Sequence, residues 1–356
     1  MPLYRVVSRS AGPELGRTDS YRVEAALSGP SGMLYSTIPS DVALGDLVDG
    51  SGQLVAKNRS ALPLDRQDWW RLHRIGRNLA ERHRIERAVR AWFDAEGFLD
   101  VTTPAMARSP GLEVHLVAFP VKDRFLITSP EYHMKRLLSA GWDRLVFHGR
   151  AFRDDEAGHL HHAEFTMLEW YRAFAEPVDI MSDIARLVAI ATGRERPWTT
   201  LTVRTAVARY AGLSEREDDP ERILRALVEH VEPALAELGA VFLTEWPSSL
   251  ASLARLNEGD PTVSDRFEAY LDGVELANGF GELTDAGEQR ARLEHDQAER
   301  RAAGLPVYPI DEAFLGALEA GLPRCSGVAL GLDRLIKIAL GAASLDDVVA
   351  FTPALA

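Results

Sequence analysis

The amino-acid sequence predicts an α+β protein in which helices pack on a mainly antiparallel sheet, with a small β-rich segment before it. Hydrophobic residues make up 46% of the 356 residues and charged residues 26%, a balance typical of a globular protein that buries a full core. Residues 1–65 contain short strand-like runs between Gly, Pro, Ser and Asp residues. Residues 66–356 combine helices and strands in an order that indicates an antiparallel sheet, so we expect the main domain there.

The N-terminal segment, residues 1–65, shows the pattern of short strands. The runs "YRVEAAL" and "GMLYSTIP" are predicted to be strands, and "GDLVDGSGQLVAKNRS" to be a hairpin around an Asp-Gly-Ser-Gly turn. We expect a fragment of a barrel, and nothing in the sequence indicates its role.

A long helix is expected at the start of the main domain, because apolar residues recur at helical spacing as far as Gly97, a natural end. The segments "FLDVTTPAM" and "RFLITSP" are predicted to be strands, the first ended by Pro104. The segment "EYHMKRLLSAG" is predicted to be a helix that ends at its glycine. Residues 145–152 and 164–172 are expected to be two strands joined by a charged loop.

The second half of the main domain begins with a mostly helical region, residues 178–239, broken near Gly193–Pro197 and near Asp218–Pro220. The runs "AVFLTEWP" and "RFEAYLDGVELANG" are predicted to be strands, and a polar helix is expected over residues 284–303. The final run, "CSGVALGLDRLIKIALG", is predicted to form a strand, a turn and a helix.

Composition limits where the protein works and what it binds. No window approaches the roughly 18 consecutive apolar residues of a membrane helix, and the N-terminal run lacks the apolar region of a signal peptide, so we expect a cytoplasmic protein. The single cysteine, Cys325, excludes an internal disulfide, and we expect it to be buried. The net charge of −13 argues against a nucleic-acid partner, and the seven arginines of residues 71–90 are interpreted as a solvated helix face.

The run "FRDDEAGHLHHAEFTMLEWY", residues 152–171, raises the question of a transition-metal site, because it holds three histidines among acids. Structural zinc sites combine Cys and His in closed sets, and this chain has one distant cysteine. On a strand, His159 and His161 would share a face that His162 would not. We therefore interpret the histidines as part of a solvated or ligand-contacting loop.

The strand that follows this loop carries an unusual carboxylate. Alternation places Glu169 and Tyr171 on one face among apolar neighbours. A carboxylate on such a face is costly unless a cation or a hydrogen-bond donor meets it. Two interpretations stay open, an ion pair with a core arginine and a pocket for a cationic ligand.

Two arginines are candidates for binding an anion. Arg153 ends a strand at the mouth of the same hairpin, where its guanidinium could fork onto phosphate or carboxylate oxygens. The alternative is an ordinary salt bridge with Asp154 or Asp155. Arg334 lies in the first turn of a helix, where the helix dipole disfavours a cation unless an anionic ligand is bound there. A salt bridge with Asp333 or another acid is the alternative.

Glu275 and Glu282, in "VELANGFGELTD", are candidates for a magnesium site. They are seven residues apart, so a regular strand would place them on opposite faces, but Gly279 and Gly281 allow a bulge or turn that brings them together. Converging carboxylates need a cation, and oxygen ligands suit Mg²⁺ that bridges nucleotide phosphates. Two separately solvated acids at a sheet edge are the alternative.

Taken together, these stretches resemble the signature motifs of a class II aminoacyl-tRNA synthetase catalytic domain. "EGFLDVTTPAM" resembles the first motif, whose proline, here Pro104, lies at a dimer interface. "FRDDE…HHAEFTMLEWY" resembles the second motif and "GVALGLDRL" the third. Within the lysine branch of that class, "TSPEYHMKRLL", "EFTMLEWYR", "ELANGF" and "CSGVALG" are most similar to the elongation factor P–lysine ligases. The resemblance runs from about residue 75 to residue 356.

The resemblance implies an ATP-dependent ligase that uses Mg²⁺, and it implies roles for individual residues. ATP would be bound by Arg153, Asp154, Asp155, His162, Glu275, Leu276, Gly331 and Arg334. Of these, Arg153, Arg334 and Glu275 would be catalytic, and Glu275 with Glu282 would hold the metal ion. The amino-acid pocket would be lined by Ser129, Pro130, Glu131, Tyr171 and Glu282, and by Glu169 on the strand alternation above.

The chain departs from the pattern of this family at three positions and in its N-terminal segment. Asp155 stands where the family commonly has Glu, and His162 where it has Asn. Gly281 stands where the family commonly has His, which predicts a gap near the pocket. The N-terminal 65 residues exceed what these ligases usually carry, yet they are too few for a complete anticodon-binding barrel.

From this resemblance we expect ATP-dependent activation of lysine or (R)-β-lysine as an aminoacyl-adenylate, and transfer to the ε-amino group of a lysine on elongation factor P. A homodimer is expected by family likeness. One alternative is a tRNA-charging lysyl-tRNA synthetase with a reduced N-terminal domain, although the charge balance disfavours tRNA. The other is a synthetase-like regulatory protein that binds its ligands without catalysis.

Overall fold

The computed structural model describes residues 3–10, 22–29, 32–39, 41–63, 66–154, 158 and 160–352. The chain divides into two compact units, residues 1–84 with 346–351 and residues 85–345 with 352–356. Helix α1, Asp68–Ala95, contains residues of both units and ends before Gly97, as the sequence predicts. The predicted domain boundary between residues 65 and 66 stays a prediction. Among the described residues, no helix is both long enough and apolar enough to cross a membrane.

The first unit contains a five-stranded antiparallel sheet with the strand order β3-β2-β1-β4-β5. The predicted hairpin is present, because the Asp49 carboxylate accepts hydrogen bonds from the backbone N–H groups of Ser51 and Gln53 and so fixes the turn. One side of the sheet buries a small apolar cluster that includes Val6, Leu27 and Ile38. The strands are β1 Leu3–Ser10, β2 Arg22–Gly29, β3 Gly32–Pro39, β4 Leu47–Asp49 and β5 Leu54–Ala56.

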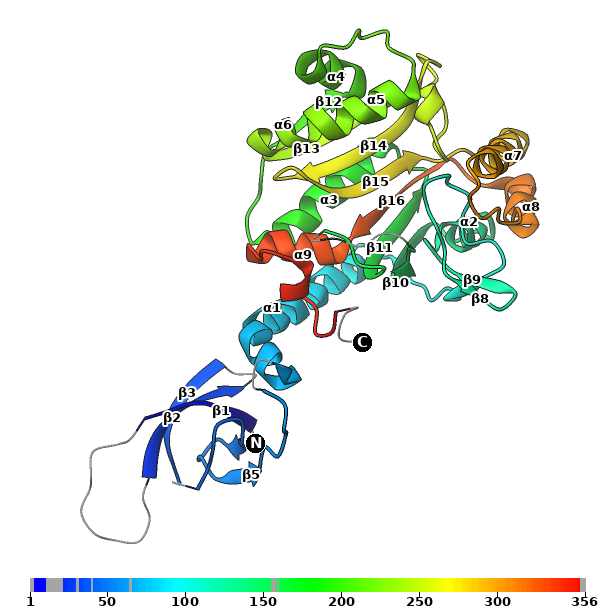
Figure 1. Ribbon diagram of the computed structural model, residues 1–356. Coiled ribbons are helices and arrows are strands. Elements are labelled where there is room, and N and C mark those ends of the chain that lie inside the picture. The colour runs from blue at the N-terminus through cyan, green and yellow to red at the C-terminus, as the bar shows by residue number, and fades with distance from the viewer. Residues whose placement is uncertain are drawn as a thin grey trace. The chain divides into compact units, whose positions relative to one another are not determined.

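The second unit is built on an eight-stranded sheet with the order β12-β13-β14-β15-β16-β11-β10-β6 (Figure 1). All neighbours from β13 to β10 are antiparallel, and the two outermost pairs, β12–β13 and β10–β6, are parallel. The prediction of a mainly antiparallel α+β fold is therefore confirmed. The strands are β6 Leu99–Asp100, β10 Arg144–Phe152, β11 Glu164–Ala173, β12 Trp198–Thr202, β13 Ala240–Pro247, β14 Val263–Leu271, β15 Val274–Gly281 and β16 Cys325–Gly331.

Helices flank both faces of this sheet (Figure 1). Helices α3, Pro177–Thr192, and α9, Leu332–Leu340, pack against the central strands on one face. Helix α2, Glu131–Ser139, packs against β10, β11 and helix α8, which also contacts α7. A third group packs on β13, and the remaining bounds are α4 Val203–Ala211, α5 Pro220–Ala226, the π-helix η2 Leu227–Val231, α6 Glu232–Leu238, α7 Ala286–Ala302 and α8 Glu312–Gly321.

The strand register decides which residues share the face that carries the candidate site. Glu169 lies opposite Ala329, Ala329 opposite Asn278, and Asn278 opposite Glu268. Directly opposed residues project to the same side of a sheet, so this row crosses four strands on one face. The neighbouring Trp170 projects to the other face, where its fully buried indole donates a hydrogen bond to Asp183 of α3 at 3.1 Å.

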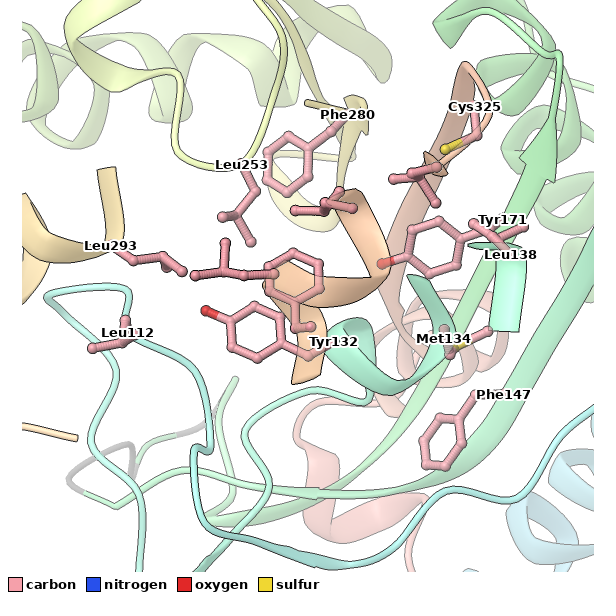
Figure 2. Packing of buried hydrophobic residues seen from close by; sticks show 14 of the residues in the cluster. Leu112, Tyr132, Met134, Leu138, Phe147, Tyr171, Leu253, Phe280, Leu293 and Cys325 are labelled. Carbon is pink, nitrogen blue, oxygen red and sulfur yellow. The ribbon is translucent and has the colours of Figure 1, made fainter. Parts of the chain in front are cut away.

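An apolar cluster fills the space between the site face of the sheet and α2, α7 and α8 (Figure 2). Within it, the ring of Tyr132 stacks on that of Phe314, with centroids 4.5 Å apart. The ring of Tyr171 lies over Gly327 of β16, where a Cβ atom would come within 2.2 Å of it. Gly327 is therefore needed to let this aromatic ring approach the sheet, as the sequence predicts for a glycine that allows a close approach.

Several local predictions are wrong in detail. The run "RFEAYLDGVELANG" forms a hairpin of β14 and β15, because Asp272 and Gly273 take positive φ angles of 51° and 81° and turn the chain. Strand β12 lies inside the region predicted to be mostly helical. The strands predicted near residues 98–106 and 124–130 are short. The first run contains β6, which joins the large sheet, and the start of β7 Met106–Ala107. Strand β7 forms a small separate sheet with β9 Arg124–Leu126, from the second run, and β8 Pro120–Val121.

Candidate active site

A bulge in β15 sets the orientation of the candidate metal-binding carboxylates. Ala277 pairs with Ala269 but Glu275 pairs with Tyr270, so Leu276 is an extra residue in β15. The extra residue reverses the alternation, and Glu275 therefore shares the site face with Asn278. The predicted bulge exists, but the structure places it at Leu276, which is buried, and not at the glycines that follow.

A buried lysine of α2 joins two acids that are far apart in the sequence. The Lys135 ammonium lies 2.6 Å from Glu131 Oε1 and 2.6 Å from Glu282 Oε2, and its side chain is completely buried. Burial lowers the pKa of Lys135, but the charges of Glu131 and Glu282 raise it more, so the net shift is upward. Burial raises the pKa of Glu282 to about 7, although Lys135 opposes this shift. Glu282 thus belongs to a buried ion triad on the site face.

Glu169 lies beside this triad and is held by hydroxyl groups. Tyr171 Oη donates a hydrogen bond to one of its carboxylate oxygens at 2.8 Å, and Ser129 Oγ donates to the other at 2.9 Å. Burial, followed by the charge of Glu131, raises the pKa of Glu169 to about 8. No arginine among the described residues forms an ion pair with Glu169, so the structure favours the ligand pocket over the core ion pair.

The start of α2 completes this pocket. Pro130 is the residue before the helix, and its carbonyl oxygen accepts hydrogen bonds from His133 and Met134. Ser129 Oγ also accepts a hydrogen bond from the backbone N–H of Glu131 at 3.0 Å, which orients the serine between the two acids. The predicted residues Ser129, Pro130, Glu131, Glu169, Tyr171 and Glu282 are therefore brought together by α2, β11 and β15.

Arg334 connects β15 to the loop between β10 and β11. Its guanidinium donates to the carbonyl oxygen of Glu275 at 2.9 Å and to that of Leu160 at 3.1 Å, and it also contacts the ring of His161. The Glu275 carboxylate lies 3.6 Å away. The alternative partner Asp333 is buried and accepts a hydrogen bond from the backbone N–H of Thr166 at 2.7 Å. Gly331 is the residue from which α9 starts.

Arg153 lies at the other end of the same loop. Its guanidinium stands 5.2 Å from the centre of the Phe165 ring, and its backbone N–H donates to Ala163 at 2.8 Å. Asp154 forms a bridge with Val117 through its backbone, and His162 is buried. Both arginines therefore border the loop that resembles the second motif. The predicted ATP contact Asp155, like His159, lies outside the described residues.

Comparison with known proteins agrees with this architecture. The model of the family described as tRNA synthetases class II (D, K and N) matches residues 65–354. The chain belongs to the class II tRNA synthetases. It is 41% identical over 307 residues to the elongation factor P–(R)-β-lysine ligase of Proteus mirabilis strain HI4320, covering 77% of this chain and 94% of that relative. It is also 41% identical over 310 residues to the proteins of the same name from Salmonella gallinarum strain 287/91 and Salmonella agona strain SL483, with the same coverage.

In this class II synthetase, the sequence reasoning missed two carboxylates beside Glu275. Tyr270 Oη donates to Glu268 at 2.8 Å and to Glu232 of α6 at 3.4 Å. Burial raises the pKa of Glu268 to about 7; Arg266 opposes this shift and Glu275 adds to it. A signal for Glu268 existed, because Glu268 and Tyr270 have the same spacing as Glu169 and Tyr171, whose hydroxyl makes the same 2.8 Å contact.

The predicted gap at Gly281 is wrong. A Cβ atom at this position would lie 2.8 Å from the guanidinium carbon of Arg255 and 2.9 Å from Cβ of Asp265. Arg255 fills this space because its Nε atom forms a 2.7 Å ion pair with Asp265 and another nitrogen an ion pair with Glu176 at 2.5 Å. The side chain of Arg255, from another segment of the chain, thus occupies the space that the family's larger residue would fill.

Proposed function

We propose that this synthetase uses ATP to activate lysine or (R)-β-lysine and transfers the acyl group to the ε-amino group of a lysine on elongation factor P. The observation that carries the proposal is the excess of buried acid in the pocket. Glu131, Glu169 and Glu282 share one buried cation, Lys135, so a ligand that brings an amino group meets compensating charge. The printed names of the relatives supply the amino acid and the acceptor.

The first step joins the amino acid to the nucleotide. A carboxylate oxygen of the amino acid attacks the α-phosphorus of ATP in line, the bond to the bridging oxygen breaks, and pyrophosphate leaves. Arg153 and Arg334 would bind the phosphate oxygens and stabilise the charge that develops on them, because both border the loop of the second motif. The pocket acids would hold the amino end of the substrate, so the enzyme acts by positioning and electrostatics.

The second step transfers the acyl group. The neutral ε-amino group of the acceptor lysine attacks the carbonyl carbon of the aminoacyl-adenylate, AMP leaves with the bonding electrons, and the new amide nitrogen loses a proton. No enzyme nucleophile is required. The buried thiol of Cys325 has no part in this scheme, because burial raises its pKa and prevents a thiolate.

The carboxylates beside Arg334 fit a magnesium ion. Burial and, to a smaller extent, the charge of Glu275 raise the pKa of Glu268, and a divalent cation would relieve the repulsion between the two carboxylates. Mg²⁺ bound there would neutralise phosphate charge. Of the two acids predicted to hold it, Glu275 keeps that role in our proposal, with Glu268, whereas the ion pair of Glu282 with Lys135 assigns Glu282 to the amino-acid pocket. Among the described residues, no three or more His, Cys, Asp or Glu side chains are grouped to hold a metal, so phosphate oxygens and water would complete the set.

Two assays test the proposal. The purified enzyme should catalyse ATP–pyrophosphate exchange that depends on lysine or (R)-β-lysine, and intact-mass analysis should show that elongation factor P gains one aminoacyl group when enzyme, ATP and amino acid are present. Transfer to tRNA but not to the protein would favour the tRNA-charging alternative. Silence with every amino acid would favour the non-catalytic one. The homodimer and the cytoplasmic location remain parts of the proposal, and sedimentation of the purified enzyme tests the dimer.

A further inference from the structure

A small cavity lies beside Glu131, and most of its wall comes from residues without an assigned role. The loop that precedes β8 contributes Ser109 and Glu113, and the start of α2 contributes Ser129, Glu131 and Tyr132. The cavity offers about 10 Å³ to the centre of a water-sized group. That volume is about what one water molecule needs, and an ammonium group has nearly the same size.

Two polar atoms around this cavity have no hydrogen-bond partner among the described residues, Ser109 Oγ and Glu113 Oε2. Ser109 and Tyr132 are each only 6% exposed, and the Tyr132 hydroxyl meets the backbone N–H of Leu112. The hydroxyl of Tyr132 points to the side on which Leu112, the neighbour of Glu113, lies (Figure 2). Because buried polar atoms are almost always paired in folded proteins, two unpaired atoms at one small cavity indicate a group that fills it.

The electrostatics favour a positively charged occupant. Burial, then the charge of Glu131, raises the pKa of Glu113 to about 7, whereas Arg153 lowers it. Burial, then Glu113 and Glu131, raises the pKa of Tyr132 as well, so the tyrosine stays neutral and its hydroxyl can accept a hydrogen bond from a cation. A cation in the cavity would meet two carboxylates that otherwise repel each other.

Buried contacts hold the backbone of the loop that carries Glu113. Arg300 of α7 is completely buried and donates to the carbonyl oxygens of Glu113 at 2.8 Å, Leu116 at 2.9 Å and Val114 at 3.2 Å. Gly111 has a φ of +120°, and a Cβ atom there would lie 2.8 Å from Glu113 Oε2. A buried arginine and a glycine thus fix the backbone on both sides of this carboxylate.

We infer that Glu113, with Glu131 and Tyr132, binds the amino group of the substrate that lies nearer to its carboxyl group, which makes the enzyme specific for diamino acids. The inference rests on the proposed function. Val117, four residues after Glu113, accepts a hydrogen bond from the backbone N–H of Asp154 at 2.7 Å, so the loop that carries Glu113 runs beside Arg153, the arginine assigned to the phosphate. Glu169 and Tyr171 would then hold the amino group at the far end.

The decisive experiment combines a variant with a substrate that lacks one amino group. ATP–pyrophosphate exchange is measured for wild type and Glu113→Gln with lysine, (R)-β-lysine and 6-aminohexanoate, which has only the far amino group. Loss of one charged hydrogen bond predicts a fall in kcat/KM of about 10- to 100-fold for both diamino acids. With 6-aminohexanoate the two enzymes should agree within about threefold, and the KM for ATP should not change.

Two further variants separate binding from structure. Tyr132→Phe keeps the ring stack on Phe314 and should reduce kcat/KM for the diamino acids alone, by a smaller factor than Glu113→Gln. Glu312→Gln, in an exposed ion pair with Arg290, is the matched control and should leave all three substrates unchanged. Glu113→Gln removes a buried charge that Glu131 opposes, so its urea midpoint should equal or exceed that of wild type at pH 8.

Each other outcome overturns the inference. An equal loss with all three substrates, or a raised KM for ATP, would show that Glu113 acts through Arg153. Unchanged kinetics would show that the cavity binds no amino group. Wild-type enzyme that activates no diamino acid at all would overturn the proposed function together with the inference, so the two failures are distinguishable.

Discussion

Replacement of Lys135 by methionine should destabilise the protein strongly and in a pH-dependent way. The ammonium lies 2.6 Å from Glu131 and 2.6 Å from Glu282, with its side chain fully buried, so its removal leaves two buried carboxylates without their cation. Breaking a buried pair of this kind costs about 3–5 kcal/mol. We therefore expect Lys135→Met to lose about 3–5 kcal/mol of unfolding free energy at pH 8, measured by urea unfolding with tryptophan fluorescence.

The loss should shrink as the pH falls. Burial already raises the pKa of Glu282 to about 7 with the lysine present, and the pKa rises further when the lysine is gone. For each additional proton that the folded variant takes up relative to wild type, the loss of unfolding free energy shrinks by about 1.4 kcal/mol per unit that the pH is lowered. At pH 6 the difference from wild type should therefore be about 1–3 kcal/mol smaller than at pH 8.

Two variants serve as controls for Lys135→Met. The double variant with Glu282→Gln removes one of the orphaned acids and should recover part of the stability at pH 8. Arg290→Met breaks an exposed ion pair of similar length, 2.5 Å to Glu312, and should leave the urea midpoint almost unchanged at either pH. A loss below about 1 kcal/mol for Lys135→Met, or a loss that does not change with pH, would refute this account of the buried triad.

Three other predictions concern the same unit. In the folded protein the pKa values of Glu113 and Glu282 are about 7 and that of Glu169 is about 8. Protonation of these carboxyl groups therefore stabilises the folded state fully below the unfolded pKa near 4.5, and this stabilisation disappears as the pH rises through 7–8. The free enzyme should therefore be more stable at pH 5.5 than at pH 8.5. Binding of a diamino acid at pH 7 should release protons from these carboxyl groups. A calorimetric binding enthalpy that is the same in buffers of different ionisation enthalpy would contradict the proton release. Arg334→Lys keeps the charge but cannot reach the carbonyl oxygens of Glu275 and Leu160 together, so kcat/KM for ATP in pyrophosphate exchange should fall about 10- to 100-fold. A change below threefold, no larger than that of the exposed Arg301→Lys, would count against it. Gly281→Ala places a Cβ atom 2.8 Å from Arg255 and should lower the free energy of unfolding in urea by about 1–3 kcal/mol. The control Gly316→Ala, whose Cβ atom would have no neighbour within 4 Å, should not destabilise the protein. Equal stabilities of the two variants would show that Arg255 moves freely.

Local patterns predicted most of the secondary structure, and their errors have physical causes. The helix that became α1 and the strand–helix pair of β16 and α9 follow from periodicity and from terminal glycines. The β14–β15 hairpin was missed because its Asp272-Gly273 turn interrupts an almost continuous strand-like run. Strand β12 was missed because its five residues pair only at the sheet edge, and an edge pairing depends on a neighbour that is distant in the sequence.

The candidate site shows the same division. Alternation along β11 predicted that Glu169 and Tyr171 share a face, and the 2.8 Å hydrogen bond between them confirms it. Alternation along β15 predicted opposite faces for Glu275 and Glu282 unless a bulge intervened, and only the pairing with β14 located that bulge at Leu276. The residues around Glu113 in the sequence do not predict a binding site, because its contacts with α2 and α7 form only in the folded protein.

The sequence by itself determined the family, the order of strands and helices, and the residue types available for phosphate and amine recognition, because these depend on motifs and short periodicities. The tertiary structure alone decided which charges meet. Lys135 and Glu282 lie 2.6 Å apart although the chain separates them widely, and Arg255 fills the space beside Gly281 from another loop. Coulomb and hydrogen-bond energies depend on distances in space, which follow from strand register and helix packing and are not encoded in local spacing.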